Sequence, residues 1–303
     1  MKFELTILGC SSATPTSNRF PSAQVLNISE HFFLIDCGEG AQIQLRRFSF
    51  KIQRINHIFI SHLHGDHYFG LMGLLSSMHL LGRKKPVHLY AHANLREIIN
   101  IQLKSSDTRL NYELIFHPLA YEKSEIILDE KTFTVETILL NHRIPCCGFL
   151  FREKPRERSI VKSKIKEFEI PVSFIPAIKN GEDFLTLDGR RIPNNEITLE
   201  PPPPRSFAYC SDTCYDERLL AQISEVDLLY HEATFLHEML ERAKETYHTT
   251  ALQAGTLALK ANVKQLIIGH YSARYKNPLP LLKEAQSVFP ATLLGEEGKT
   301  YVF

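Results

Sequence analysis

The feature that most constrains the fold is a run of four potential metal ligands within six residues, His62-Leu63-His64-Gly65-Asp66-His67. The run follows an apolar stretch at 56–61 and precedes residues 70–81, where leucine and methionine recur near the helical repeat. It therefore belongs in a turn between a strand and a helix. In such a turn the first two histidines share a face, whereas the last two ligands are displaced around the turn. This pattern suits two adjacent metal ions.

Three further donors follow predicted strands elsewhere in the chain. His142, Asp212 and His270 each come directly after an apolar stretch. Open α/β sheets gather their ligands at such strand ends. Imidazole and carboxylate groups favour Zn²⁺, and Mn²⁺ or Fe²⁺ can substitute for it. Each of the three taken alone is equally well a structural polar residue, but together with the run at 62–67 they form a consistent set.

The rest of the chain alternates short apolar stretches with helical patterns. Its 303 residues, 44% of them hydrophobic, are enough to bury a large core. The predicted strands are 3–8, 24–28, 31–35, 56–61, 87–91, 132–140, 207–210, 226–230 and 265–268, and the predicted helices are 70–81, 216–223 and 249–261. Threonines at the start of the last helix can cap it. This alternation implies an α/β fold of sheets covered by helices.

Residues 152–205 differ from this pattern. They lose the long buried stretches, gain charge and end in the stiff spacer Pro201–Pro204. Asp188-Gly189 indicates a hairpin turn. The first fifteen residues of the segment contain seven basic and two acidic side chains. We expect one domain over residues 1–303, with residues 152–205 inserted as a projecting arm. The basic residues of this arm either form an ordinary solvent-exposed face or contact a nucleic acid.

Charge and composition limit the remaining possibilities. The net charge of +1 is too small to attract nucleic acid to the protein as a whole, so a polyanion could bind only at a local patch of basic residues. The start of the chain is too charged for a signal peptide, and no apolar stretch reaches a membrane-spanning length. We expect a cytoplasmic protein with no membrane partner. The six cysteines form no CxxC pair, which favours buried thiols over disulfides in a reducing compartment.

Several motifs together carry a resemblance to a known family. The H-x-H-x-D-H pattern after a strand resembles the metallo-β-lactamase superfamily. Within it, the chain resembles the ribonuclease Z family of tRNA 3′-processing endonucleases over residues 8 to 275. The motifs are Leu8 to Thr16, Leu34 to Gly40, His62 to His67, His231-Glu232-Ala233-Thr234-Phe235, His248-Thr249-Thr250-Ala251 and His270 to Tyr275.

The resemblance implies an αββα four-layer sandwich with two Zn²⁺ per subunit. It assigns His62, His64 and His142 to one zinc and Asp66, His67 and His270 to the other, with Asp212 bridging them. Asp36 would support the ligand loop. The family arm has a Gly-Pro-rich tip, which is absent here, where residues 170–176 read IPVSFIP.

The implied reaction is removal of the 3′ trailer from precursor tRNA, leaving a 3′-hydroxyl on the tRNA and a 5′-phosphate on the trailer. Asp66 would orient the attacking water and accept its proton, and His248, paired with Glu232, would protonate the leaving 3′ oxygen. Family members are typically homodimers, so we expect one here. Two alternatives stay open: a hydrolase of this fold acting on a small substrate, such as a phosphodiesterase, and an RNA-binding scaffold without metals.

Overall fold

A computed structural model describes residues 2–303 of the chain. Its contacts divide these residues into two compact units. The smaller unit consists of Asp129–Thr134 and Arg152–Arg205, and the rest of the described chain forms the larger unit.

The larger unit is built on two seven-stranded sheets. The first has the order β18 (Thr300–Val302), β1 (Phe3–Gly9), β2 (Ala23–Ile28), β3 (His31–Cys37), β4 (Ile55–Phe59), β5 (Val87–Ala91), β6 (Leu114–Pro118). The second has the order β17 (Thr292–Leu294), β16 (Gln265–Gly269), β15 (Leu228–Glu232), β14 (Ser206–Cys210), β9 (Cys147–Glu153), β8 (Phe133–Leu139), β7 (Ile126–Asp129). Strands β3 to β6 run parallel, as do β14 to β17. Parallel neighbours end at the same edge, which brings their following loops together.

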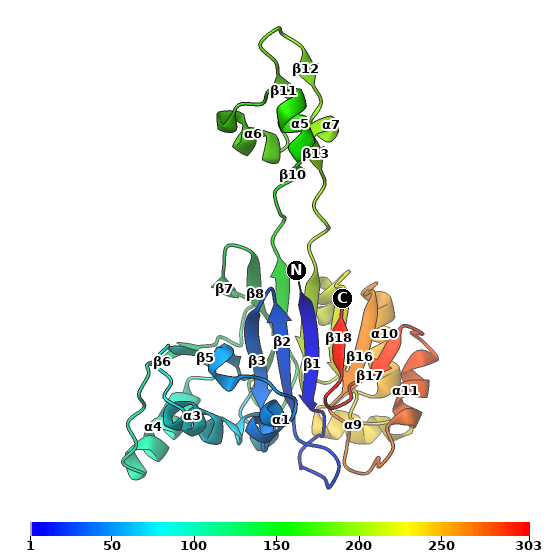
Figure 1. Cartoon of the computed structure of the whole chain (residues 1–303). Coiled ribbons are helices and arrows are strands. Elements are labelled where there is room, and N and C mark those ends of the chain that lie inside the picture. Colours follow the sequence, from blue (N-terminus) through cyan, green and yellow to red (C-terminus); the bar gives the residue numbers. More distant parts are fainter. Residues whose placement is uncertain (1) are drawn as a thin grey trace. The chain divides into compact units, whose positions relative to one another are not determined.

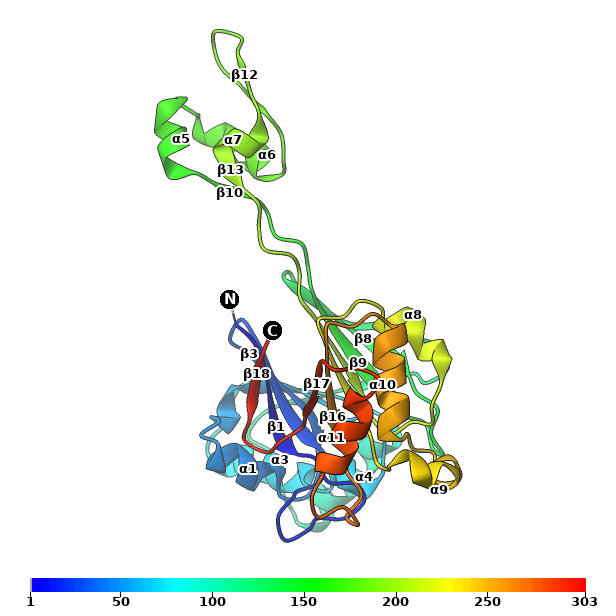
Figure 2. The same ribbon diagram turned by 90° about the vertical axis from the view of Figure 1, so that its right-hand side faces the viewer.

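The two sheets pack face to face through aromatic side chains. Phe33 and Phe59 of the first sheet lie 5.6 Å, between ring centroids, from Phe151 of the second. The helices of the larger unit are α1 (Ala41–Arg47), α2 (Gly65–Tyr68), α3 (Leu71–Leu80), α4 (Asn94–Ser105), α8 (Leu220–Ile223), α9 (Leu240–Thr246), α10 (Ala251–Lys260) and α11 (Leu279–Gln286). Helices α1, α3 and α4 lie beyond the first sheet and α10 and α11 beyond the second (Figures 1 and 2). The predicted αββα sandwich is confirmed.

Local sequence explains how the helices bury one face. In α3, Leu71, Leu74, Leu75 and Met78 are buried and recur at helical spacing. Helix α10 begins at the predicted threonine cap, because Thr250 and Gln253 form a reciprocal capping box. A Cβ atom on Gly255 of α10 would lie 2.8 Å from the carbonyl oxygen of Ala285, so glycine permits the close approach of α11.

The sequence patterns located most of the central strands. Residues 87–91 are β5, and the boundaries of β1, β2, β8 and β16 agree with their predictions to within one residue at each end. Strand β15 starts two residues later than predicted. The patterns missed α4, which buries only Leu95 and Ile99, and α11. They also missed the edge strands β6 and β7, whose residues are half-buried or exposed and therefore show no clear alternation.

A stack of histidines crosses the parallel part of the first sheet. The rings of His57 and His88 lie 4.8 Å apart, and Nδ1 of His88 lies 3.0 Å from Nε2 of His117. Burial, together with the neighbouring histidines, lowers the pKa of His57 to about 4. These histidines therefore pack against one another across the sheet.

His57 makes stability depend on pH. The unfolded chain binds a proton at this residue near pH 6.5, whereas the folded chain takes it up only near pH 4. The free energy of unfolding should therefore fall by about 2 kcal/mol as the pH drops from 7 to 5, and the contribution of His57 should be nearly constant above pH 7. Urea unfolding at pH 7 and pH 5 measures it. His57→Phe should lose less stability between these pH values than wild type or His92→Phe; an equal loss in all three contradicts the assignment.

The smaller unit has its own apolar core. Its elements are β10 (Ser159–Ile160), α5 (Lys162–Glu167), α6 (Ile175–Lys179), β11 (Phe184–Leu185), β12 (Arg191–Ile192), α7 (Asn194–Ile197) and β13 (Thr198–Leu199). The buried side chains are Ile170, Ile178, Phe184, Ile192 and Ile197. The predicted hairpin turn is present between β11 and β12, where Gly189 has φ 85°. Residues 152–205 are thus more ordered than their charged sequence suggests.

None of the helices within residues 2–303 combines the length and the apolar character needed to span a bilayer.

Candidate metal centre

All seven sequence-predicted donors lie together, although they come from four separate loops. His62, His64, Asp66 and His67 follow β4, and the other three follow β8, β14 and β16. The donors form two clusters that share Asp212, and the ligand atoms within each cluster lie within 4.8 Å of one another. One cluster is His62, His64, His142 and Asp212, and the other is Asp66, His67, His270 and Asp212.

In the first cluster three imidazole nitrogens converge on one point. Nδ1 of His64 lies 3.0 Å from Nε2 of His62 and 3.1 Å from Nε2 of His142. Oδ2 of Asp212 lies 3.6 Å from Nε2 of His62 and 3.9 Å from Nε2 of His142. Lone pairs on all these atoms can face a single cation.

The second cluster pairs two imidazoles with two carboxylates. Oδ1 of Asp212 lies 3.2 Å from Nε2 of His270 and 3.3 Å from Nε2 of His67. Oδ2 of Asp66 lies 3.3 Å from Nε2 of His270 and 3.4 Å from Nε2 of His67. Asp212 thus directs one oxygen to each cluster, which is the arrangement of a bridging ligand.

Two buried atoms test whether these residues suit metal ions. Among the described residues, Nε2 of His67 and Oδ1 of Asp212 are buried and lie 3.3 Å apart, but neither makes a well-directed hydrogen bond. A buried polar atom without a partner is costly, and a coordinated cation removes that cost. The donor set is also the one that divalent transition metals prefer. The site therefore fits a divalent metal cofactor.

The protonation states of the donors also suit metal binding. Burial lowers the pKa of His62, His64 and His142, so these imidazoles are neutral at pH 7. Burial opposes ionisation of Asp66 and Asp212, but the neighbouring histidines hold the pKa of both carboxyls well below the usual range. Around His67 the effect of burial is overcome by three aspartates, which raise its pKa. Their combined negative charge favours a proton or, equally, a metal cation.

The outer nitrogens of the histidines are fixed by residues that the sequence patterns did not single out. Nδ1 of His62 bonds with Ser61, that of His270 with Thr234, and that of His142 with the carbonyl oxygen of Tyr247, at 3.0 Å in each case. Such contacts set the ring orientation and leave the opposite nitrogen free for a metal. Thr234 lies within a recognised motif and Ser61 directly precedes one, but small polar residues give no signal of this role by themselves.

Asp36 supports the ligand loop, as the resemblance implies. Its carboxylate lies 2.7 Å from Nδ1 of His67 and accepts hydrogen bonds from the amide of Ser61 at 2.8 Å and from the hydroxyl of Tyr209 at 2.6 Å. Asp36 is buried and has φ 54°, a conformation that aspartate and asparagine tolerate better than most residues. It therefore orients His67 from behind.

Asp36→Asn should weaken metal binding without unfolding the chain, because asparagine keeps the shape and the backbone conformation but removes the charge behind His67. We expect metal affinity to fall by about 10- to 100-fold, measured by competition with a chelator. Asp107→Asn, which makes the same change at an exposed aspartate that also has positive φ, serves as the control. Unchanged affinity in Asp36→Asn contradicts a supporting role.

Glu232 and His248 form a second arrangement beside the donors. Oε1 of Glu232 lies 2.8 Å from Nδ1 of His248, and Oε2 accepts hydrogen bonds from the amide and the hydroxyl of Thr234 at 3.0 and 2.7 Å. Burial opposes protonation of His248, but the charge of Glu232 and its hydrogen bond raise the pKa of the imidazole to about 9. The pair therefore holds a proton near the metal donors at neutral pH.

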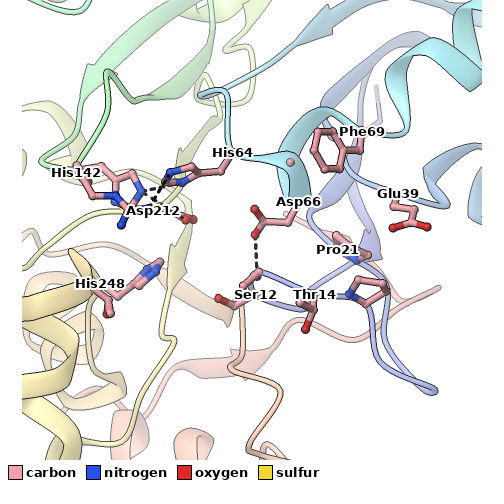
Figure 3. A pocket seen from close by; sticks show the side chains of 15 residues that line it. Ser12, Thr14, Pro21, Glu39, His64, Asp66, Phe69, His142, Asp212 and His248 are labelled. Carbon is pink, nitrogen blue, oxygen red and sulfur yellow. Dashed lines mark hydrogen bonds and ion pairs between the residues drawn. The ribbon is translucent and has the colours of Figure 1, made fainter.

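These groups line a cavity of about 540 Å³ that opens between loops of the larger unit. His64, Asp66, His142, Asp212 and His248 are on its wall, and Figure 3 shows His248 on one side of Asp66 and Phe69 on the other. The amide of Ala13 donates a hydrogen bond of 2.8 Å to Oδ2 of Asp66, which ties the loop after β1 to the site.

Comparison with known proteins places the chain in a family. The family model described as anti-Pycsar protein Apyc1 matches residues 3–161, a range that includes the run at 62–67 but ends before Asp212, Glu232, His248 and His270. A protein named Ribonuclease Z from Bacteroides fragilis is 51% identical over 297 residues, 98% of each chain. Human tRNase Z, short form, has 29% identity and a TM-score of 0.72, with 98% of each chain covered.

A third likeness concerns the fold alone. YhfI from Bacillus subtilis, a metallo-beta-lactamase fold protein, has 17% identity and a TM-score of 0.70, with 99% of each chain covered. Together with the two donor clusters, these likenesses define a metal-dependent hydrolase with the metallo-β-lactamase fold. Because the match to the 51% identical relative extends over nearly the full length of both chains, this chain belongs to the ribonuclease Z family. The resemblance inferred from the motifs is confirmed.

Proposed function

We propose that this chain is an endoribonuclease that removes the 3′ trailer from precursor tRNA, leaving a 3′-hydroxyl on the tRNA and a 5′-phosphate on the trailer. The observation that carries the proposal is the Glu232–His248 pair, held at 2.8 Å beside seven converging donors. A metal site alone serves many hydrolases of this fold. The added proton donor is what a poor alkoxide leaving group requires.

We propose further that the two clusters hold two Zn²⁺ ions, with His62, His64 and His142 in one site, Asp66, His67 and His270 in the other, and Asp212 shared. Mn²⁺ and Fe²⁺ prefer similar donors and are substitutes. When bound, such a pair of ions supplies a nucleophile from water at neutral pH and neutralises charge on the phosphate. Mixed imidazole and carboxylate donors support zinc over the harder magnesium ion.

The side chains have distinct proton-transfer roles in this proposal. The Asp66 carboxylate remains ionised at neutral pH, and its side chain is 8% exposed at the cavity wall, so it can orient the attacking water. As the resemblance implies, we assign to it the proton of that water as well. His248 uses Nδ1 to bond Glu232, which leaves Nε2 to donate a proton to the departing 3′ oxygen. Its side chain is 13% exposed, enough to contact substrate in the cavity. Glu232 keeps the imidazole charged and oriented.

Incubation of zinc-loaded protein with a 3′-extended precursor tRNA tests the proposal. The expected result is one cut at the 3′ end of the mature tRNA, with a 3′-hydroxyl on the tRNA and a 5′-phosphate on the released trailer. The same protein treated with a chelator is the control and should not cut. Hydrolysis of a small phosphodiester without any cut in precursor tRNA would favour the small-substrate alternative.

We also propose that residues 152–205 contact the tRNA as an exosite. The proposal is supported by seven basic residues within 152–166, but the structure adds a qualification to their charge. Lys154, Arg156, Arg158 and Lys164 are paired with Asp129, Glu153, Glu200 and Glu167. Over 152–205 eleven basic residues face nine acidic ones, so recognition must use the position of individual charges more than a net field.

Deletion of residues 155–198 tests the exosite. The Michaelis constant for precursor tRNA should rise by about tenfold or more, because several phosphate contacts are lost. Hydrolysis of a small phosphodiester, which is too short to reach beyond the cavity, serves as the matched control and should change far less. Equal losses on both substrates would argue against an exosite.

We further propose that the chain acts as a homodimer in the cytoplasm, as the family resemblance suggests. The mass of one chain is 34.8 kDa, so sedimentation should give about twice this value for the dimer. A single species at the monomer mass in active preparations would rule the dimer out.

A further inference from the structure

Phe69 is an aromatic side chain exposed at the rim of the metal cavity. It follows α2, the short helix that carries Asp66 and His67, and lines the same cavity as the donors. Its side chain is 65% exposed, so packing in the core does not account for its presence. An exposed ring beside a reaction centre is typical of a contact with a flat, apolar part of a ligand.

The ring of Phe69 lies against two neighbouring residues although it is largely exposed. A Cβ atom on Gly65 would lie 2.2 Å from Cε2 of Phe69, so the ring leans back over the glycine. The ring of Tyr68 contacts it at 5.0 Å between centroids, in an edge-on arrangement. The amide of Phe69 donates to the carbonyl oxygen of Gly65 at 2.9 Å. The ring is therefore preorganised next to the donors.

The surroundings of Phe69 differ from those of His248. Figure 3 shows Asp66 between the two, with Glu39, Pro21 and Thr14 on the side of Phe69. The described residues that line this side include no lysine or arginine, whereas Arg143 lies beside His64 at 3.4 Å. A single-stranded RNA segment that extended toward Phe69 would therefore be held by base stacking more than by charge.

We propose that Phe69 stacks on the base of the first trailer nucleotide, which directly follows the cut. The inference rests on the proposed function, because it uses His248 as the group that protonates the 3′ oxygen of the tRNA. That assignment places the tRNA end near His248, and the trailer continues from the same phosphate through its 5′ oxygen. The strand that continues past Asp66 then meets Phe69. Every base offers a flat face, so the contact discriminates by stacking strength and favours purines.

A double-mutant cycle, which combines variants of Phe69 with changes of the first trailer base, tests the stacking contact. The substrates are precursor tRNAs with adenine, uracil or no base at the first trailer position. Wild-type protein should cut the adenine substrate with a kcat/KM about tenfold above that for the abasic one, with uracil between them. Phe69→Ala should lose about tenfold on adenine and little on the abasic substrate. Phe69→Trp, which keeps a stacking ring, should restore the order of the three substrates, and it decides the case if Phe69→Ala binds less metal.

Three results overturn the contact. In the first, Phe69→Ala loses the same factor on the adenine and abasic substrates. In the second, a further substrate that lacks the base of the last tRNA nucleotide, not of the first trailer nucleotide, abolishes the effect of Phe69→Ala, which places Phe69 against the tRNA end. In the third, Phe69→Trp cuts all three substrates alike. Wild-type protein that fails to cut precursor tRNA at all overturns the proposed function itself, so the two failures are distinguishable.

Discussion

Asp212→Ala should remove both metal binding and activity. Asp212 is buried and is the only donor shared by the two clusters of described residues. Its loss takes one oxygen from each cluster and leaves five histidines with a single carboxylate. We expect turnover to fall by at least about a thousandfold, beyond the 10- to 100-fold typical of a residue that only supports a ligand. Metal content per chain and turnover under the same conditions measure the effect.

A matched aspartate separates this effect from a general loss of charge. Asp216 lies four residues further along the chain and bonds with Arg218 through its side chain. Asp216→Ala should therefore keep both metal and turnover. If Asp212→Ala retained two metal ions and near-normal turnover, Asp212 would not be a shared ligand.

His248→Ala should have the second-largest effect, and it should leave the metal in place. The imidazole is held by Glu232 and does not belong to either cluster that contains Asp212. Loss of a general acid typically costs about 10²- to 10⁴-fold in turnover, and we expect a loss in this range. Metal analysis of the same preparation should give the wild-type content. Lost metal with unchanged turnover per bound metal would refute the role.

Glu232→Gln tests the partner in the same reaction. Glutamine keeps the shape of the side chain but removes the charge that raises the pKa of His248. The loss of turnover should therefore be smaller than that of His248→Ala. Glu241→Gln, in which the exposed partner of Lys244 is changed, is the control and should have no effect.

The sequence predicted the composition of the site better than its geometry. The run at 62–67 is recognisable by itself, because four potential ligands within six residues are rare by chance. His142, Asp212 and His270 could be selected only because each follows an apolar strand, and their convergence depends on the order of strands in the second sheet. That order is set by pairing between segments far apart in the chain, such as β15 with β16.

The residues that orient the ligands could not be predicted in the same way. Ser61 and Thr234 are small polar residues in buried surroundings, a pattern equally typical of ordinary packing. The carbonyl oxygen of Tyr247 acts through the backbone, and its left-handed conformation at the end of α9 carries no sequence signal. Phe69 was equally invisible, because one phenylalanine after a histidine motif does not reveal its exposure.

The charged segment illustrates a different limit. The segment has a local excess of basic residues, but two of them pair with acidic residues that are distant in sequence. Arg158 pairs with Glu200, and Lys154 pairs with Asp129. Ion pairs of this kind depend on the folded backbone, so a count along the sequence overstates the charge available to a nucleic acid.

Anomalous diffraction at the zinc edge, from crystals of the zinc-loaded chain, tests the central claim most directly. We predict two peaks in each chain, one among His62, His64 and His142 and one among Asp66, His67 and His270, with an oxygen of Asp212 directed to each. A single peak, or two peaks that leave His142, Asp212 or His270 directed elsewhere, would contradict the account.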